Sequence, residues 1–260
     1  MKVLVFGGSF DPVHKGHVSL FRRAMKVIAP DVAHIVPAYH SPFKAKSPTP
    51  FRLRMKMLKL AFAGFGKNIV FDDYELKQGG KTYTYQLVQY LKKRYDNPEI
   101  YLLVGTDCLN DLHNWKNPGY IFDNAVVVAG KRKGYNENPA QFNHLFLPGF
   151  FPKLSSSRVR AHILACGDVP DTVPEIIAPI IRENNLYGLD VHTWLKAHLK
   201  PNRYLHSKNV AEMAAAFSDI YDVNVELAVK AGIMHDAGKG FSGPELIAFC
   251  KEHKIKVPFF

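Results

Sequence analysis

Residues 7–17 read Gly-Gly-Ser-Phe-Asp-Pro-Val-His-Lys-Gly-His and follow directly on the apolar run Val3–Phe6. Two glycines after a buried strand let the backbone approach a ligand closely and present N–H groups to phosphate. His14 and His17 stand three positions apart, so at the start of a helix they share one face. A helix N-terminus also favours anions. The stretch therefore predicts a strand, a phosphate-binding turn and a helix that opens at Gly16.

Apolar runs alternate with helix-like segments around this stretch, which predicts an α/β fold with a parallel sheet covered on both faces. Ligands of such sheets bind outside the carboxyl ends of the strands. Gly7 and Gly8 follow the first expected strand, and Gly105 and Asp107 follow the fourth, so we expect two strand ends at one crevice. The expected strands are Val3–Phe6, Ala33–Pro37, Ile69–Phe71, Ile100–Val104 and Ala125–Ala129, and the expected helices are His17–Ile28, Arg52–Phe62 and Thr84–Lys93.

The pattern changes near Gly188, where we place a domain boundary. Beyond it we find no strand pattern, and three helices are expected at 191–199, 207–218 and 225–234. The chain is thus expected to hold a sheet domain over residues 1–188 and a small all-α segment over 189–260.

Composition narrows the class of protein. The 260 residues carry a net charge of +11, with no tract of five or more like charges, which disfavours nucleic-acid binding and suits a pocket for several phosphates. No apolar run approaches the roughly 20 residues that cross a bilayer, and the first residues lack a signal-peptide pattern. Cys108, Cys166 and Cys250 fit no zinc ribbon or redox pair. We expect a cytoplasmic protein without a membrane partner, and the oligomeric state stays open.

Residues 7–17 resemble the signature of the HxGH nucleotidyltransferases, which join a nucleoside monophosphate to a phosphorylated acceptor. The resemblance implies a Rossmann-like, doubly wound parallel sheet. It also implies that His14 and His17 bind the nucleotide phosphates and that His17 steadies the transition state. The residues implied to line the ATP site here are Gly7, Gly8, Ser9, Phe10 and Gly16.

Further segments resemble the nicotinate mononucleotide adenylyltransferases of bacteria. Thr82-Tyr-Thr84 is similar to their Ser-Tyr-Thr, which places Thr84 near the acceptor base. Gly105-Thr-Asp107, followed by Trp115, is similar to their Gly-x-Asp and Trp, in which the Trp stacks on the pyridine ring. The resemblance gives Gly105 and Asp107 to the ATP site, and Thr84, Trp115 and Arg132 to the acceptor. Asp107 could instead cap the turn after the fourth strand.

The resemblance extends to two more segments, each of which contains a basic residue. The loop Pro37–Lys44 resembles a family loop that ends in Pro-Pro-His-Lys or -Arg; Lys44 is kept, whereas Phe43 replaces the usual His and Ser41 the first Pro. Leu154–Arg160 resembles Ile-Ser-Ser-Thr-x-Ile-Arg, which binds ATP phosphates at a helix start. The residues this implies are Ser155, Ser156, Ser157 and Arg160.

The resemblance implies transfer of AMP from ATP to nicotinate mononucleotide, with His14, His17, Lys44 and Arg160 as the catalytic groups. Mg²⁺ is expected to be held mainly by the ATP phosphates. Three alternatives stay open at this point. The acceptor could be nicotinamide mononucleotide or phosphopantetheine, the protein could be a non-catalytic basic protein that binds nucleotides or nucleic acid, or it could be a nucleotide phosphohydrolase.

The phosphohydrolase alternative comes from the C-terminal segment. An adjacent His235-Asp236 pair and the earlier His206 suit a divalent metal. They resemble the start of the HD-domain phosphohydrolases, especially a bacterial group that hydrolyses diadenosine tetraphosphate symmetrically, in which these three residues would be metal ligands. Only His253 follows as a histidine and no Asp follows. We therefore expect the segment to be the first part of an HD domain, either truncated or an inactive remnant.

Overall fold

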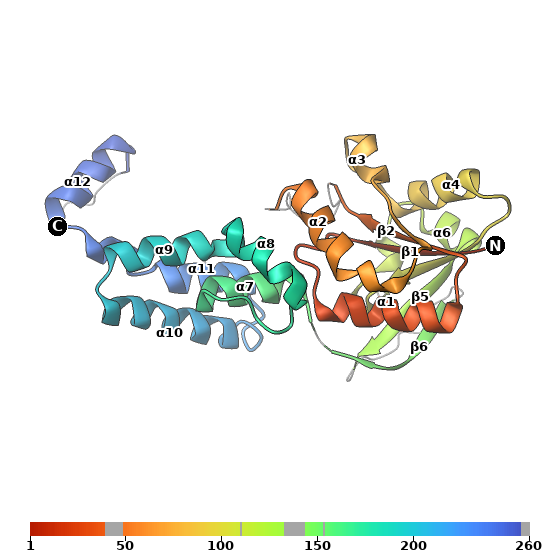
Figure 1. Cartoon of the computed structure of the whole chain (residues 1–260). Helices are drawn as coiled ribbons and strands as arrows, with labels where there is room; N and C mark the ends of the chain where they lie inside the picture. Colours follow the sequence, from red (N-terminus) through yellow and green to blue (C-terminus); the bar gives the residue numbers. More distant parts are fainter. Residues whose placement is uncertain (40–48, 110, 133–143, 153, 256–260) are drawn as a thin grey trace. The chain divides into compact units, whose positions relative to one another are not determined.

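The computed structural model describes residues 1–39, 49–109, 111–132, 144–152 and 154–255. The chain divides into two compact units. The sheet unit comprises Met1–Ser156 and Asp171–Ile180, and the helical unit comprises Ser157–Pro170 and Ile181–Phe260. Figure 1 shows both units, coloured along the sequence.

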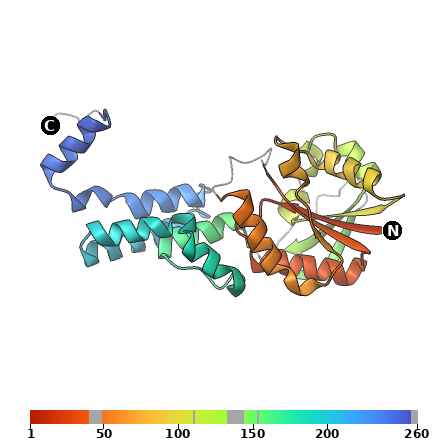
Figure 2. The same ribbon diagram turned by 45° about the horizontal axis from the view of Figure 1, so that its top comes forward.

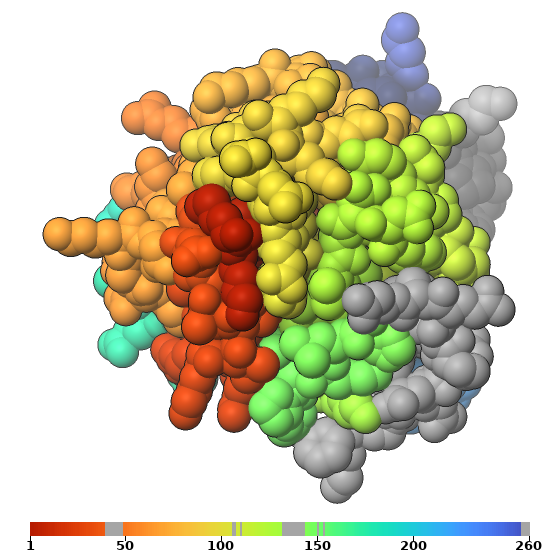
Figure 3. Space-filling view, turned by 90° about the vertical axis from the view of Figure 1, so that its right-hand side faces the viewer, coloured from red at the N-terminus to blue at the C-terminus, as the bar shows by residue number. Residues whose placement is uncertain are grey.

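Within the described residues, six parallel strands form one sheet in the order β3-β2-β1-β4-β5-β6, so the chain builds outward from β1 in two directions. Their bounds are Lys2–Gly8 (β1), Val32–Pro37 (β2), Ile69–Phe71 (β3), Glu99–Val104 (β4), Val126–Arg132 (β5) and His144–Phe151 (β6). Figure 3 looks at the face where the chain begins, and the dark-red N-terminus lies beside a yellow segment, in agreement with the pairing of β1 and β4. The predicted Rossmann-like, doubly wound parallel sheet is confirmed.

Helices cover both faces of the sheet, as Figures 1 and 2 show for α1 on one side and for α4 and α6 on the other. The central strand is buried on both faces, since Val3, Leu4 and Val5 are fully inaccessible to solvent. Such burial explains why the strand reads as a continuous apolar run. The α-helices of the sheet unit are α1 (Lys15–Ile28), α2 (Phe51–Ala61), α3 (Tyr74–Gln78), α4 (Thr84–Arg94), α5 (Thr106–Leu109) and α6 (Pro118–Asn124).

The sequence analysis missed strand β6. Its apolar start is followed by Pro148 and Gly149, two residues that normally interrupt strands. β6 lies at the edge of the sheet, and its pairing with β5 shifts register between Gly130 and Lys131. An edge position and an irregular ladder tolerate a proline that a central strand would exclude.

The helical unit has its own apolar core. Small and aliphatic side chains from four helices share this core: Ala161 and Ala165 of α7, Leu195 of α9, Ala211 of α10 and Val229 of α11. Its helices are α7 (Ser156–Cys166), α9 (Leu189–His198), α10 (Pro201–Phe217), α11 (Val225–Met234) and α12 (Gly243–Glu252). Helix α8 (Ala178–Glu183) is divided between the two units after Ile180. No helix within the described ranges is long and apolar enough to cross a membrane.

The two compact units do not divide at the boundary that we placed near Gly188. Helix α7 precedes that position in sequence, yet all but its first residue belongs to the helical unit. The cause is packing, because the buried alanines of α7 lie in the core of the later helices. The boundary near Gly188 marks where the sequence pattern changes, and it stays a prediction about the sequence families. It does not mark the limit between the two compact units.

Close packing of α10 and α11 depends on Gly232. A Cβ atom at this position would lie 2.9 Å from Cα of Ala211, and a backbone atom cannot move aside as a flexible side chain would. We expect Gly232→Ala to lower the free energy of unfolding by about 1–3 kcal/mol, measured as a lower urea midpoint. Gly243→Ala is the matched control, because its Cβ would meet no atom within 4 Å. Equal midpoints for the two variants would contradict this account.

Candidate functional site

The two histidines of the motif cap the first helix with each other's side chains. His14 is the N-cap of α1, and its Nδ1 accepts a hydrogen bond from the backbone N–H of His17 (3.3 Å). In return, Nδ1 of His17 accepts from the backbone N–H of His14 (3.2 Å). The rings stack with centroids 3.6 Å apart. Since each Nδ1 is an acceptor, each neutral ring carries its proton on Nε2 and presents a hydrogen-bond donor there.

Gly16 makes the stacked arrangement possible. A Cβ atom on Gly16 would lie 2.9 Å from Nδ1 of His14 and 3.3 Å from Cβ of Leu154. On the other side, the buried ring of Phe10 meets His17 edge-on, with centroids 5.0 Å apart. Gly16 and the ring of Phe10 together determine where the two imidazoles lie.

The sheet brings the predicted strand ends together. β1 and β4 are neighbours, with Phe6 opposite Leu103, so Gly8 and Gly105 each lie two residues further along their chains. Among the described residues other than its chain neighbours, no atom would lie within 4 Å of a Cβ added at Gly105. The strand order reverses between β1 and β4, which is where ligands of doubly wound sheets bind. The backbone of Asp107 belongs to α5, and its side chain lies outside the described part.

Arg54 is a buried cation that the sequence analysis did not single out. Its side chain on α2 is only 1% exposed, and its Nη1 donates to the backbone oxygen of Ser9 (2.8 Å) while Nε donates to that of Thr49 (3.2 Å). It therefore ties α2 to the predicted phosphate loop. A sequence signal was present, because an arginine stood among the apolar positions of an amphipathic helix.

The predicted acceptor residues lie on the face of the sheet that carries α4 and α6. Thr84 is the first residue of α4, and the half-buried Trp115 packs against the apolar cluster that α4 and α6 share. Thr82, two positions earlier, is buried, and its hydroxyl has no hydrogen-bond partner among the described residues. Lys44 lies outside the described residues, as do Ser41 and Phe43, and the side chain of Arg132 at the end of β5 is also outside the description.

The Ser155-Ser156-Ser157 motif spans the start of α7. Ser155 and Ser156 belong to the sheet unit, where the hydroxyl of Ser156 donates to the backbone oxygen of Pro12 (2.9 Å). This contact joins the serine motif to the histidine motif. Ser157 and Arg160 belong to the helical unit.

Arg160 is engaged by a carboxylate in the helical unit. Its Nε donates to Oε1 of Glu226 (2.8 Å), and its Nη2 donates to Oε2 (2.5 Å). Such a two-point guanidinium–carboxylate pair is the strong form of a charge-assisted hydrogen bond. Glu226 lies in the first turn of α11. Arg158, two positions earlier on α7, forms an ion pair with Asp219.

The three expected metal ligands of the C-terminal segment converge. His206 on α10 and the His235-Asp236 pair after α11 place their ligand atoms within 4.8 Å of one another. Nδ1 of His235 lies 2.7 Å from the backbone oxygen of Gly232, which leaves Nε2 facing Nε2 of His206 at 3.2 Å. A hydrogen bond from Arg203 holds the pKa of Asp236 below its ordinary value. The donor set suits a divalent cation.

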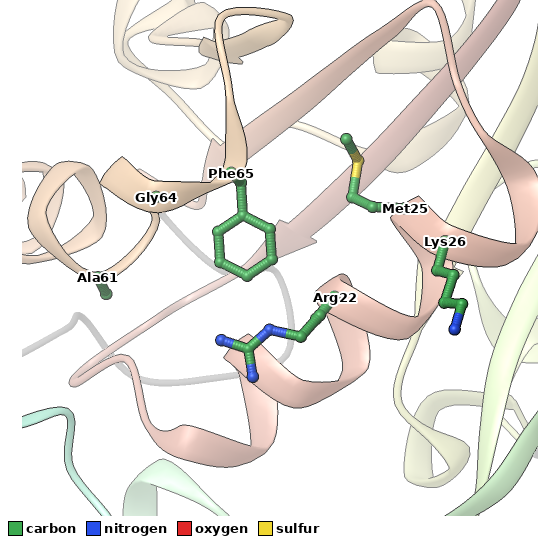
Figure 4. Close-up of a pocket in the computed structure, with 6 residues that line it drawn as sticks. All are labelled: Arg22, Met25, Lys26, Ala61, Gly64 and Phe65. Carbon is green, nitrogen blue, oxygen red and sulfur yellow. The ribbon is translucent and has the colours of Figure 1, made fainter.

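A separate depression contains none of the predicted site residues. It is lined by Arg22, Met25, Lys26, Ala61, Gly64 and Phe65, and the guanidinium of Arg22 lies 5.3 Å from the centre of the Phe65 ring (Figure 4). The candidate site thus rests on the motif loops rather than on this surface hollow.

Comparison with known proteins identifies the family. Residues 5–162 match the cytidylyltransferase-like family, and residues 203–257 match the HD domain. A probable nicotinate-nucleotide adenylyltransferase of Clostridium tetani is 31% identical over 198 residues, which cover 72% of this chain and 98% of that protein. This chain belongs to the nicotinate-nucleotide adenylyltransferase family.

Two further comparisons extend this result. A probable nicotinate-nucleotide adenylyltransferase/Ap4A hydrolase of Mycoplasma genitalium is 28% identical over 249 residues, covering 95% of this chain and 68% of that protein. The structure of Plasmodium falciparum nicotinic acid mononucleotide adenylyltransferase complexed with NaAD matches the fold with a TM-score of 0.61 at 21% identity, covering 72% of this chain and 97% of that one. The resemblance to an adenylyltransferase joined to an HD segment is confirmed.

Within this adenylyltransferase, Glu75 is a half-buried acid that contacts one of the predicted loops. Its carboxylate on α3 accepts a hydrogen bond from the backbone N–H of Tyr39 (3.0 Å), within the predicted loop Pro37–Lys44. Burial raises the pKa of Glu75 to about 7, although the Tyr39 N–H and the charge of Arg54 oppose the rise. The carboxyl is therefore partly protonated at neutral pH.

Glu75 should make stability depend on pH. The folded state holds this proton more tightly than the unfolded chain, whose carboxyl titrates near 4.5. Stability from this group is present below about 4.5 and is lost as pH rises to about 7, by at most about 3 kcal/mol. Glu75→Gln should flatten that part of the profile in urea unfolding measured at several pH values. An unchanged slope in the variant would refute the assignment.

Proposed function

We propose that this chain transfers AMP from ATP to nicotinate mononucleotide, forming nicotinate adenine dinucleotide and releasing pyrophosphate. The observation that carries the proposal is the stacked pair of His14 and His17 at the start of α1. The pair follows β1 at the point where the sheet reverses its strand order. Membership of the nicotinate-nucleotide adenylyltransferase family supports the same reaction.

The reaction needs no nucleophile from the protein. An ionised phosphate oxygen of the acceptor attacks the α-phosphorus of ATP, one P–O bond forms, and the bond to the departing pyrophosphate breaks. Catalysis then consists of positioning and of stabilising charge on the phosphoryl oxygens. The Nε2–H donors of His14 and His17 and the helix N-terminus suit that task.

Mg²⁺ is proposed as the companion of ATP. The donors of the histidine motif are N–H groups, which fit phosphate oxygens rather than a cation. Mg²⁺ usually keeps several waters and binds through substrate phosphates. When bound, it neutralises part of the triphosphate charge and thereby eases departure of pyrophosphate.

The acceptor side is proposed from Thr84 and Trp115, with Arg132 assigned by family resemblance. The same resemblance assigns Lys44 as a catalytic group and Asp107 to the ATP site. Ser9, Gly7, Gly8 and the serines of α7 are likewise assigned to ATP. The buried Thr82 hydroxyl adds an observation of this chain, because a buried hydroxyl without a partner costs free energy unless a ligand satisfies it.

Pyrophosphate release tests the proposal. Purified protein with ATP and Mg²⁺ is offered nicotinate mononucleotide, nicotinamide mononucleotide or phosphopantetheine separately, and release is expected with the nicotinate form. His17→Ala should lower the rate about 10²–10³-fold, since it removes one preorganised donor. The exposed His253→Ala serves as the control. Full activity in a folded His17→Ala, or no release with any acceptor, would refute the assignment.

The pairing of Arg160 has a consequence for this function. The family motif gives Arg160 to the ATP phosphates, whereas Glu226 accepts hydrogen bonds from Nε and Nη2 of its guanidinium. A phosphate that binds Arg160 must compete with this carboxylate. We propose that Glu226, from the HD segment, weakens ATP binding.

Removing the charge of Glu226 tests this competition. Glu226→Gln should lower the KM for ATP about two- to fivefold, because a partly exposed ion pair contributes about 0.2–1 kcal/mol. Asp219→Asn is the matched control, since Asp219 pairs with Arg158 instead. An unchanged or higher KM in Glu226→Gln, with the control at the wild-type value, would show that Arg160 does not exchange partners.

The HD segment supports a second proposal, binding of a divalent cation by His206, His235 and Asp236. The convergence of their ligand atoms carries it. Hydrolysis of Ap4A appears in the name of the Mycoplasma relative, of which this chain spans 68%. We propose cation binding alone for this segment.

A further inference from the structure

A second group of ligand-type side chains lies at the end of α7, away from the HD residues in sequence. His162 and Cys166 stand four positions apart on the helix, so they share one face. Asp168 follows them, and its ligand atom lies within 4.8 Å of those of His162 and Cys166. Glu212 approaches from α10, with its Oε1 3.7 Å from Sγ of Cys166.

The imidazole of His162 is oriented by a carboxylate. Its Nε2 lies 3.2 Å from Oδ1 of Asp168, and its Nδ1 faces Sγ of Cys166 at 3.9 Å. Gly167, between the thiol and the carboxylate, has φ of 76° and turns the chain back so that Asp168 reaches the ring. A histidine that donates one N–H to a carboxylate and turns its other nitrogen toward a soft ligand has the arrangement found around bound metals.

The charges around Cys166 are mainly negative. Glu212 and Asp168 act on the thiol from two segments of the chain, and Lys208 has a smaller opposite effect. A positive ion between the sulfur and the carboxylates would be stabilised by these charges.

The separations between donor atoms suit a small metal ion. Zn²⁺ binds sulfur at about 2.3 Å and nitrogen or oxygen at about 2.0–2.2 Å in tetrahedral geometry, so its ligand atoms lie about 3.5 Å apart. Sγ of Cys166 lies 3.9 Å from Nδ1 of His162 and 3.7 Å from Oε1 of Glu212. Glu212 is not in the group of ligand atoms that all lie within 4.8 Å of one another, so its side chain would have to turn toward His162 to complete the set.

We propose that His162, Cys166 and Glu212 bind a divalent transition-metal ion of the Zn²⁺ class, with Asp168 orienting the imidazole. The S–H bond of Cys166 breaks as the sulfur–metal bond forms, and the proton passes to solvent. Three protein ligands leave a fourth position for water. The ion would tie α7 to α10 within the helical unit.

Titration of the full chain with Co²⁺ tests the site, because Co²⁺ bound to a thiolate gives a charge-transfer band in the near ultraviolet. His206, His235 and Asp236 include no thiol, so Co²⁺ bound there lacks this band. We expect the band at one equivalent in wild-type protein, with affinity that rises with pH because a proton is released. Cys166→Ser and His162→Ala should abolish it, and Asp168→Asn should weaken Co²⁺ binding about 10–100-fold.

Controls separate this site from the rest of the chain. Cys250→Ser and a double variant, His206→Ala with His235→Ala, should keep the band. No band in wild-type protein, or a band that persists in Cys166→Ser, overturns the proposal. Alkylation provides a second measurement that needs no variant: Zn²⁺ should protect Cys166 but not Cys250 from iodoacetamide, and equal labelling with and without Zn²⁺ also overturns it.

Discussion

The need to satisfy the backbone N–H groups at the start of α1 imposes the constraint on which the site depends. The first turn of any helix leaves backbone donors without partners inside the helix. Here His14 and His17 satisfy two of them with their Nδ1 atoms, and this fixes which edge of each ring carries a proton. The same contacts that stabilise the helix start thus place a ring N–H on each Nε2, and these are the donors that we propose for phosphate.

Two hydrogen bonds from distant segments hold the loop before this helix in place. Arg54 holds the backbone of Ser9, and Ser156 holds that of Pro12, so segments far apart in sequence converge on residues 8–17. Both anchors are hydrogen bonds to carbonyl oxygens, and Arg54 is almost completely buried. A preorganised loop of this kind requires little rearrangement when charge develops on a bound phosphate.

Helix α7 contains the serine motif of the adenylyltransferase family and packs against helices of the HD segment. Its first turn carries the serine motif and Arg160, its middle packs into the core of the later helices, and its end carries His162 and Cys166. The charge of Arg160 is shared with Glu226 of the HD segment. A single helix therefore places an adenylyltransferase motif in direct electrostatic contact with the C-terminal segment.

By itself the sequence determined the strand-turn-helix motif, the parallel sheet and the family, because glycine spacing and apolar periodicity are local properties of the chain. It also placed β3 and α11 at their observed bounds. Only the tertiary structure revealed the edge strand β6, the buried Arg54, the Glu226 partner of Arg160 and the grouping of α7 with later helices. Each of these depends on contacts between residues far apart in sequence, and no local pattern encodes which distant carboxylate or carbonyl a buried arginine meets.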